Sequence, residues 1–153
     1  VTLGGELRMR LKLRFSFTGY NAIKLFKHLM IQEGYPNTVT SGYAMDVAIS
    51  LAKNYLVGIE EKDEKINYLL LAGKGEKSVI KYIMEVFPET HQEAYYNSTL
   101  NVKQSTAEYI ENFRRMLAEN IYESRIYKQY AVKLLMIIAV LIKYNDINEY
   151  IIK

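Results

Sequence analysis

The sequence predicts an α+β fold that is mainly helical, and three observations support this prediction. Apolar residues recur every three to four positions over most of the chain, which is the spacing of amphipathic helices. Arg8–Phe17 instead alternates basic and apolar residues, as a half-buried strand does. Leu56–Ala72 places two short apolar runs around a charged tip, which favours a β-hairpin. We expect an N-terminal domain over residues 1–88, a connector over 89–103 and a helical packing region over 104–153.

The first element is the strand at Arg8–Phe17, and a helix is the alternative over so short a run. A period of two places basic residues on one face of the strand and apolar residues on the other. The basic face consists of Arg10, Lys12 and Arg14, and the apolar face of Leu11, Leu13, Phe15 and Phe17.

Residues 1–8 also carry a hypothesis, because Gly4-Gly5-Glu6 can be encoded by a purine-rich string that pairs with ribosomal RNA. They would then be a translated leader and Met9 the native start; the alternative is an N-terminus whose Met has been removed.

Two amphipathic helices are expected after the strand. Tyr20–Gly34 has apolar residues at helical spacing and a glycine as its stop. Pro36–Gly42 holds turn residues, and either Thr40 or Ser41 fits the N-cap of the next helix. The inward stripe of that helix, Ser41–Tyr55, would contain Ala44, Val47, Ala48, Leu51 and Tyr55, and its outward face Tyr43, Asp46, Ser50 and Lys53.

Past the second helix the period of the apolar residues changes. Leu56–Ile59 and Ile66–Ala72 are β-prone runs, and the polar segment Glu60–Lys65 between them fits the tip of a hairpin. A helix over Asp63–Ala72, ended by Gly73, is the alternative, because short apolar runs fit both structures.

Three more helices are expected after the hairpin. Glu76–Phe87 has a helical period that Pro88 terminates. Ser105 and Glu108 form a capping box, which predicts the start of another helix. Glu123–Tyr144 is apolar almost all round, so it must be covered on every side. It therefore lies either at the centre of a bundle or against a partner subunit.

Composition limits the classes of function. The chain is 50% hydrophobic and 24% charged, as an ordinary globular domain is. Lys and Arg number 20 against 17 Asp and Glu, an excess too small to identify a partner by itself. There is no cysteine, and the two histidines, His28 and His91, are far apart in the chain. We therefore expect no catalytic residues, no metal site and no cofactor, and hence no enzyme.

No targeting or membrane segment is predicted. Basic residues interrupt the apolar ones near the N-terminus, which argues against a signal peptide. Leu134–Ile142 is the most apolar run, but a bilayer requires roughly 20 such residues. We expect a cytoplasmic protein that does not contact a membrane.

The segment Gly73–Ser78 ends in Lys-Ser after a strand-like run, as a phosphate-binding loop does. That motif requires Gly directly before Lys-Ser and a second Gly five residues earlier, so that bare backbone amides can surround phosphate. Glu76 and Leu71 occupy these positions, and the carboxylate would repel phosphate. The sequence therefore argues against nucleotide binding.

The predicted order of helix, turn, helix, hairpin and helix over Gly19–Phe87 resembles the winged helix-turn-helix of MarR- and PadR-type transcription regulators. In those families the second wing strand often has the sequence Tyr-Tyr-Arg-Leu-Thr-Glu-Lys-Gly, which aligns without a gap with Tyr68–Gly75. The matching residues are Tyr68, Leu71, Lys74 and Gly75. The resemblance implies that Ser41–Tyr55 enters the major groove and that the wing tip contacts the neighbouring backbone or minor groove.

The resemblance implies a transcription regulator that binds double-stranded DNA as a homodimer held together by its C-terminal helices. The candidate DNA-contacting residues are Thr38, Thr40, Ser41, Tyr43, Ser50 and Lys53 in and before the second helix, Lys62 and Lys65 in the wing, and Lys24 and Lys27 in the first helix, with Arg10, Lys12 and Arg14 as further phosphate contacts. The alternative is a non-enzymatic helical subunit or protein-docking module of a larger nucleoprotein assembly.

Overall fold

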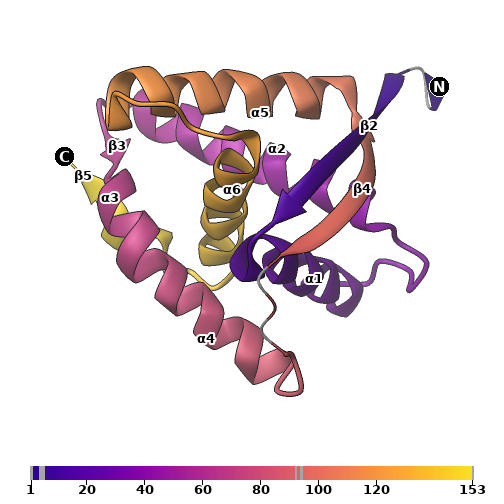
Figure 1. Cartoon of the computed structure of the whole chain (residues 1–153). Coiled ribbons are helices and arrows are strands. Elements are labelled where there is room, and N and C mark those ends of the chain that lie inside the picture. The colour runs from indigo at the N-terminus through magenta and orange to yellow at the C-terminus, as the bar shows by residue number, and fades with distance from the viewer. Residues whose placement is uncertain (1, 4–5, 92, 94, 153) are drawn as a thin grey trace.

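The computed structural model describes residues 2–3, 6–91, 93 and 95–152, and it consists of helices packed around one buried helix (Figure 1). The central helix is α6 (Lys128–Lys143), in which every residue from Leu134 to Leu141 is buried. The helices that contact it are α1 (Phe17–Gln32), α2 (Ser41–Glu60), α4 (Glu76–Val86) and α5 (Gln104–Met116). Of the two alternatives for this apolar segment, the central position in a bundle is therefore confirmed. The apolar surface that suggested a dimer interface is covered by the same chain.

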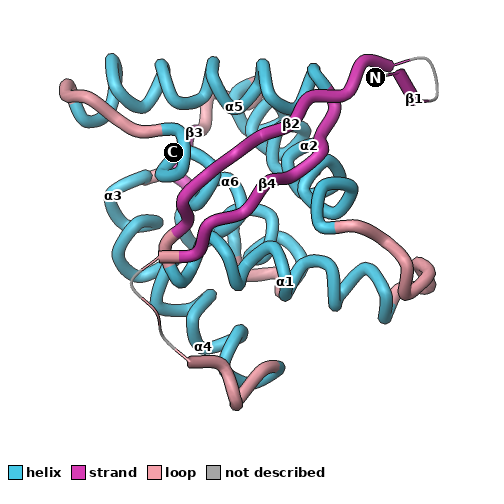
Figure 2. The backbone as a smooth tube through the Cα atoms, turned by 45° about the vertical axis from the view of Figure 1, so that its right-hand side comes forward, coloured by secondary structure: helices cyan, strands magenta, loops and turns pink. Residues whose placement is uncertain are grey.

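A two-stranded antiparallel ribbon crosses one face of the helices (Figure 2). Its strands are β2 (Glu6–Phe15) and β4 (Tyr96–Lys103), with Lys12 opposite Thr99 at the centre. A short strand, β1 (Thr2–Leu3), pairs with the other edge of β2. The predicted N-terminal strand is thus confirmed, although its partner strand lies in a segment for which no strand is predicted.

The sequence of β4 alternates over too few residues to identify it as a strand. Leu100 and Val102 are buried and Asn101 between them is exposed, as a half-buried strand requires. The residues before them, Asn97–Thr99, are all polar and carry no periodic signal. The prediction of an irregular connector is therefore wrong from Tyr96 onward.

Helices α1 and α2 confirm the two helices predicted after the first strand. Each begins at a side-chain cap, because Ser16 Oγ accepts a hydrogen bond from Gly19 N–H and Thr40 Oγ1 accepts one from Tyr43 N–H. Helix α2 runs further than its predicted end and finishes at Glu60. This extension removes the first strand of the predicted hairpin.

The predicted wing hairpin is wrong. Leu56–Ile59 belongs to α2, and the second predicted strand is largely helical, through α3 (Tyr68–Leu70) and a π-helical turn, η1 (Leu71–Gly75), that leads into α4. The short strand β3 (Lys65–Ile66) is extended, but it pairs with β5 (Ile151–Ile152) and not with the preceding run. The described residues therefore contain no wing at this place.

Local caps and tertiary contacts decide in favour of helix here, because the short apolar runs fit both structures. Ile59 is buried on the same stripe of α2 as Ala52, so the helical pattern continues through it. The chain then turns at Asp63, which has a left-handed φ of 59°. Asn67 caps the next helix, because its side chain accepts a hydrogen bond from Leu70 N–H. The alternative of a helix is closer to the structure, but the glycine expected to end it lies within a continuous helical segment.

The remaining helices agree with the sequence in type. Helix α4 is found where it is predicted. Helix α5 is also present, but its N-cap is Lys103 and not Ser105, so the predicted capping box is wrong. A π-helical turn, η2 (Leu117–Tyr122), extends α5. A short 3-10 helix, η3 (Ile147–Tyr150), follows α6.

The hypothesis of a leader over residues 1–8 stays a prediction, since Val1, Gly4 and Gly5 lie outside the described residues. In the part of the chain that the structure describes, no helix combines the length and the apolar content needed to cross a membrane.

The chain contains two strand–helix–helix units of the same design. We call β2–α1–α2 the first unit and β4–α5–α6 the second unit. The N-caps of their first helices, Ser16 and Lys103, are 87 positions apart in the sequence. The N-caps of their second helices, Thr40 and Tyr127, are separated by the same interval. The two units therefore align along their whole length without a gap.

The ribbon shows how the two units are related in space. Lys12 and Thr99 pair across the ribbon, and they are also equivalent residues, because they too lie 87 positions apart. Where a residue of an antiparallel pair lies opposite its own equivalent, a twofold axis passes between the two strands. The two units are thus related by a pseudo-twofold axis at the centre of the ribbon.

Packing inside the units repeats at the same interval. Tyr35 and Tyr43 in the first unit have ring centroids 6.3 Å apart, and their equivalents Tyr122 and Tyr130 have centroids 5.7 Å apart. Core positions repeat as well. Equivalent buried pairs are Leu13 and Leu100, Phe15 and Val102, Ile23 and Ile110, Phe26 and Phe113, Met30 and Leu117, Ala44 and Ala131, Ala48 and Leu135, and Ala52 and Ala139.

The segment between the units, residues 61–95, breaks the symmetry. Its helix α4 contacts α1 and α6, and its π-helical turn η1 contacts α6. In Figure 1, α4 lies on the side of the molecule away from the N-terminal end of β2. This segment completes the enclosure of α6, whereas α2 keeps an exposed face that includes Tyr43, Ser50 and Lys53.

Candidate nucleic-acid interface

The outward face of the β2–β4 ribbon presents six exposed polar side chains in two rows. They are Arg10, Lys12 and Arg14 from β2, and Asn97, Thr99 and Asn101 from β4. Their strand neighbours point inward, where Leu11, Leu13, Leu100 and Val102 cover the helices. The period of two therefore separates a core face from a face that is free to meet another molecule.

The outward face is basic. None of the paired ribbon residues, 8–15 and 96–103, is acidic, while three of the six outward side chains are cationic. In the described part of the chain, no hydrogen bond or ion pair engages the side chain of Arg10 or Lys12, or those of the three β4 residues. The Arg14 guanidinium lies 3.7 Å from the centroid of the exposed Tyr95 ring, which holds it at the ribbon's edge by a cation–π contact.

A buried carboxylate anchors the ribbon to the helices. Asp46 on α2 is 5% exposed and accepts hydrogen bonds from Arg8 Nη1 at 3.0 Å, from Lys103 N–H at 3.0 Å and from Thr106 Oγ1 at 2.7 Å. Arg8 Nη2 also donates to the carbonyl oxygen of Asn101 at 2.6 Å. The sequence-based expectation that Asp46 lies on the outward face of this helix is therefore wrong. Its charge is neutralised by Arg8 and it joins α2 to both strands.

The start of α2 lies against β4. A Cβ atom on Gly42 would come within 2.2 Å of the carbonyl oxygen of Asn101, so only glycine allows this approach. Four of the predicted DNA-contacting residues, Thr38, Thr40, Ser41 and Tyr43, lie in or just before this first turn of α2. The contact of Gly42 with Asn101 therefore places the first turn of α2 against β4.

The other predicted residues are not gathered there. Ser50 and Lys53 lie further along α2, and Lys53 Nζ is 5.5 Å from the ring centroid of Tyr109 on α5. Burial, and secondarily Glu60, raise the pKa of that tyrosine to about 12, so it stays neutral at ordinary pH. Lys24 and Lys27 lie on α1, where Lys24 Nζ is 4.8 Å from the Phe87 ring centroid.

The lysines assigned to the wing lie at the opposite end of α2. This helix has 20 residues and is therefore about 30 Å long. Lys62 and Lys65 follow its C-terminal end, among Glu60, Glu61, Asp63 and Glu64. The outward face of the ribbon is thus basic, whereas the far end of α2 is acidic.

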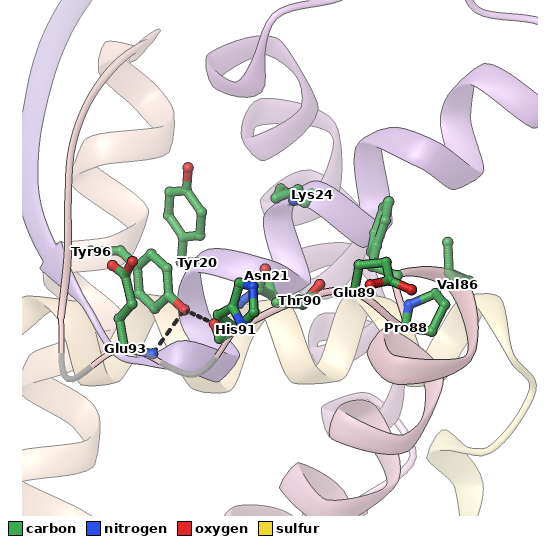
Figure 3. Close-up of a pocket in the computed structure, with 11 residues that line it drawn as sticks. Tyr20, Asn21, Lys24, Val86, Pro88, Glu89, Thr90, His91, Glu93 and Tyr96 are labelled. Carbon is green, nitrogen blue, oxygen red and sulfur yellow. Dashed lines mark hydrogen bonds between the residues drawn. The ribbon is translucent and has the colours of Figure 1, made fainter.

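A hollow of about 510 Å³ lies between α1, the end of α4 and the segment before β4 (Figure 3). Several of its polar groups are hydrogen-bonded within the protein. Tyr96 Oη donates to the carbonyl oxygen of His91 and accepts from Glu93 N–H, and the Tyr96 ring stacks on Tyr20 with centroids 4.5 Å apart. Asn21 Nδ2 donates to a backbone carbonyl of its own helix. These contacts fasten the segment to α1 and form no convergent reactive set.

Among the described residues, no three or more His, Cys, Asp or Glu side chains lie together in an arrangement that could hold a metal ion. Comparison with family models, with curated proteins and with solved structures finds no match to this chain.

Proposed function

We propose that the chain binds duplex DNA through the outward face of the β2–β4 ribbon, as a non-enzymatic protein of the transcription-regulator kind. The observation that carries the proposal is the double row of exposed side chains, three cationic and three with amide or hydroxyl groups, on a ribbon whose paired residues, 8–15 and 96–103, include no acidic residue. These are the residue types that contact phosphates and base edges in protein–DNA complexes.

The dimensions of a two-stranded ribbon support this mode of binding. The major groove of B-DNA is about 12 Å wide and accepts either a helix or a two-stranded ribbon. Paired strands lie about 4.8 Å apart, and three alternate residues on one strand span about 14 Å. With base pairs about 3.4 Å apart, each row of three side chains faces roughly four base-pair steps.

The helix start beside the ribbon supplies a second kind of contact. Unpaired backbone N–H groups and the helix dipole make an N-terminus favourable for phosphate. The first turn of α2, after Thr40, lies beside β4, and α6 contacts β2. In the proposal these two helix starts flank the ribbon and hold the DNA backbone on either side of the groove. The regulator hypothesis thereby keeps Thr40, Ser41 and Tyr43, but it assigns base contacts to the ribbon in place of α2 and a wing.

A salt series with a charge-matched control tests the proposal. The variant Arg10→Gln/Lys12→Gln/Arg14→Gln should lose most of its affinity for a mixed-sequence duplex, measured by fluorescence anisotropy. Each neutralised phosphate contributes about 0.9 to the slope of log K against log salt, so the slope should fall by up to about three. The control Lys62→Gln/Lys65→Gln/Lys81→Gln removes the same charge from exposed sites away from the ribbon and should bind nearly as the unmodified chain does.

The proposal fails if the unmodified chain does not bind duplex DNA at low salt, or if both variants lose affinity equally. Thermal melting of the two variants checks that each remains folded. Duplex RNA of the same sequence should compete weakly, because the major groove of A-form RNA is too narrow for a ribbon.

The second candidate is a helical subunit that docks into a larger assembly. It is favoured by Leu69 and Leu70 on α3, which are 66% and 39% exposed. The substitution Leu69→Ser distinguishes the two functions, because a docking role predicts that it abolishes assembly while leaving affinity for DNA unchanged. Light scattering measures whether the variant still enters the assembled complex, and fluorescence anisotropy measures its affinity for duplex DNA.

A further inference from the structure

The two rows of the ribbon occupy equivalent places but differ in chemistry. The pseudo-twofold axis makes Arg10 equivalent to Asn97, Lys12 to Thr99 and Arg14 to Asn101. The pairing places Arg10 directly opposite Asn101 and Arg14 directly opposite Asn97. Each position along the ribbon therefore presents one cationic and one neutral side chain to whatever it meets.

These side chains match different base edges. Arg and Lys are donors without acceptors, so in the major groove they fit the O6 and N7 acceptors of guanine. Asn carries a donor and an acceptor, which fit N6 and N7 of adenine, and the Thr methyl group fits the methyl group of thymine. The β2 row thus favours guanine and the β4 row favours adenine–thymine pairs.

The flanking positions extend this difference beyond the ribbon. Tyr95 is the equivalent of Arg8, since they too are 87 positions apart. Arg8 is turned inward, with only 10% of its side chain exposed, because it pairs with Asp46. Tyr95 is 56% exposed and lies under the Arg14 guanidinium. One end of the ribbon therefore carries an aromatic–guanidinium pair that the other end lacks.

A duplex has local twofold symmetry, and proteins with two identical halves recognise palindromic sites for that reason. Here the axis relates two unlike rows. We propose that the ribbon recognises a non-palindromic DNA site, with the β2 row over guanines of one DNA strand and the β4 row over adenine or thymine bases of the other strand, both along the whole site. This inference rests on the proposed function and adds the class of sequence that the ribbon selects.

Selection of duplexes from a random library by the full chain, followed by sequencing, tests the inference. We expect a short asymmetric site in which the guanines lie on one strand, interspersed with adenine–thymine pairs. Enrichment of a palindrome, or duplex binding without any enriched sequence, overturns the inference and leaves the proposed function standing. Failure to retain any duplex at low salt overturns both.

Exchange of one row sharpens the test. In the variant Asn97→Arg/Thr99→Lys/Asn101→Arg both rows carry the side chains of β2, so it should select an inverted repeat with guanines on both strands. The reciprocal variant Arg10→Asn/Lys12→Thr/Arg14→Asn should select an inverted repeat rich in adenine–thymine pairs. All six positions are exposed, so neither exchange disturbs the core.

The quantity compared is the ratio of affinities for the asymmetric site and for the inverted repeat, because added charge changes affinity for every duplex alike. One good base contact corresponds to roughly a tenfold or greater preference, so the ratio should change by at least about tenfold in each variant. An unchanged ratio in both variants contradicts the inference, since the rows would then contact phosphates without selecting bases.

Discussion

The two strand–helix–helix units have the same order of elements, yet their second helices differ in burial, because α2 keeps an exposed face where α6 is buried. Ser50, Lys53 and Asn54 on α2 are exposed, whereas their equivalents on α6 are Ile137, Val140 and Leu141, all buried. The cause is the segment between the units, whose α4 and η1 cover α6 and leave α2 open on that side. Equivalent helices of the two units are therefore exposed or buried according to whether another segment packs over them. The residues at equivalent positions are accordingly polar in α2 and apolar in α6.

The units also differ in how a single equivalent position is used. Asp46 on α2 and Lys133 on α6 lie 87 positions apart. Asp46 joins the first unit to the second through Thr106 and the backbone of β4. Lys133 instead pairs with Glu76 of the intervening segment, with Nζ 3.3 Å from the carboxylate oxygen. The first contact holds the pseudo-twofold interface together, and the second holds the inserted helix in place.

The substitution Asp46→Ala should have the largest effect on stability. It leaves the Arg8 charge buried without its partner and removes the acceptor of two further hydrogen bonds, which costs about 3–5 kcal/mol. Lys133→Met, at the equivalent position, should cost only about 1–2 kcal/mol, because that pair is more exposed. Urea denaturation of both variants measures the difference, and equal losses would contradict the distinction between the two contacts.

The substitution Ile137→Ala should come next in size. Ile137 is fully buried beneath the inserted segment, so its truncation should lower the free energy of unfolding by about 2–4 kcal/mol. The matched change in the other unit, Ser50→Ala, lies on an exposed helical face and should stay within about 0.5 kcal/mol of the unmodified chain. Thermal and chemical denaturation of the pair compares the two environments directly, and a similar loss in both would show that α2 is also covered.

The substitution Gly42→Ala should have a smaller effect on stability but a clear effect at the ribbon. The added methyl group meets the Asn101 carbonyl, so α2 and β4 must separate, at a cost of about 1–3 kcal/mol. Gly58→Ala, in the same helix, has no atom within 4 Å of the new methyl group and should stabilise the chain by about 0.5–1 kcal/mol. Opposite signs in denaturation are expected, together with weaker duplex binding for Gly42→Ala alone.

Local patterns predicted those elements whose structure depends on local periodicity. The N-terminal strand and the helices around Tyr20–Gly34, Ser41–Tyr55 and Glu76–Phe87 follow from alternating or helical spacing, and the central place of α6 follows from its apolar circumference. The hairpin prediction is wrong because runs of four to seven apolar residues fit both helix and strand, and the caps at residues such as Asn67 decide between them.

Half of the candidate interface could be predicted from the sequence. Arg10, Lys12 and Arg14 alternate with apolar residues and are predicted as DNA contacts, whereas Asn97, Thr99 and Asn101 are recognised only through their pairing with β2. That pairing joins segments far apart in the chain, and periodicity within one segment carries no information about it. The repeat is equally hidden, because equivalent positions conserve burial more than identity. Identical equivalents include Leu13 and Leu100, Phe26 and Phe113, Tyr43 and Tyr130, and Ala44 and Ala131.

Both strands of the ribbon belong to one polypeptide, and this has a thermodynamic consequence. Joining β2 to β4 is an intramolecular step, so its equilibrium does not depend on how much protein is present. Dilution cannot take the ribbon apart, and the melting temperature of its assembly should be the same at nanomolar and micromolar concentration. A change in one row also leaves the other row untouched, so each half of the surface is free to diverge separately.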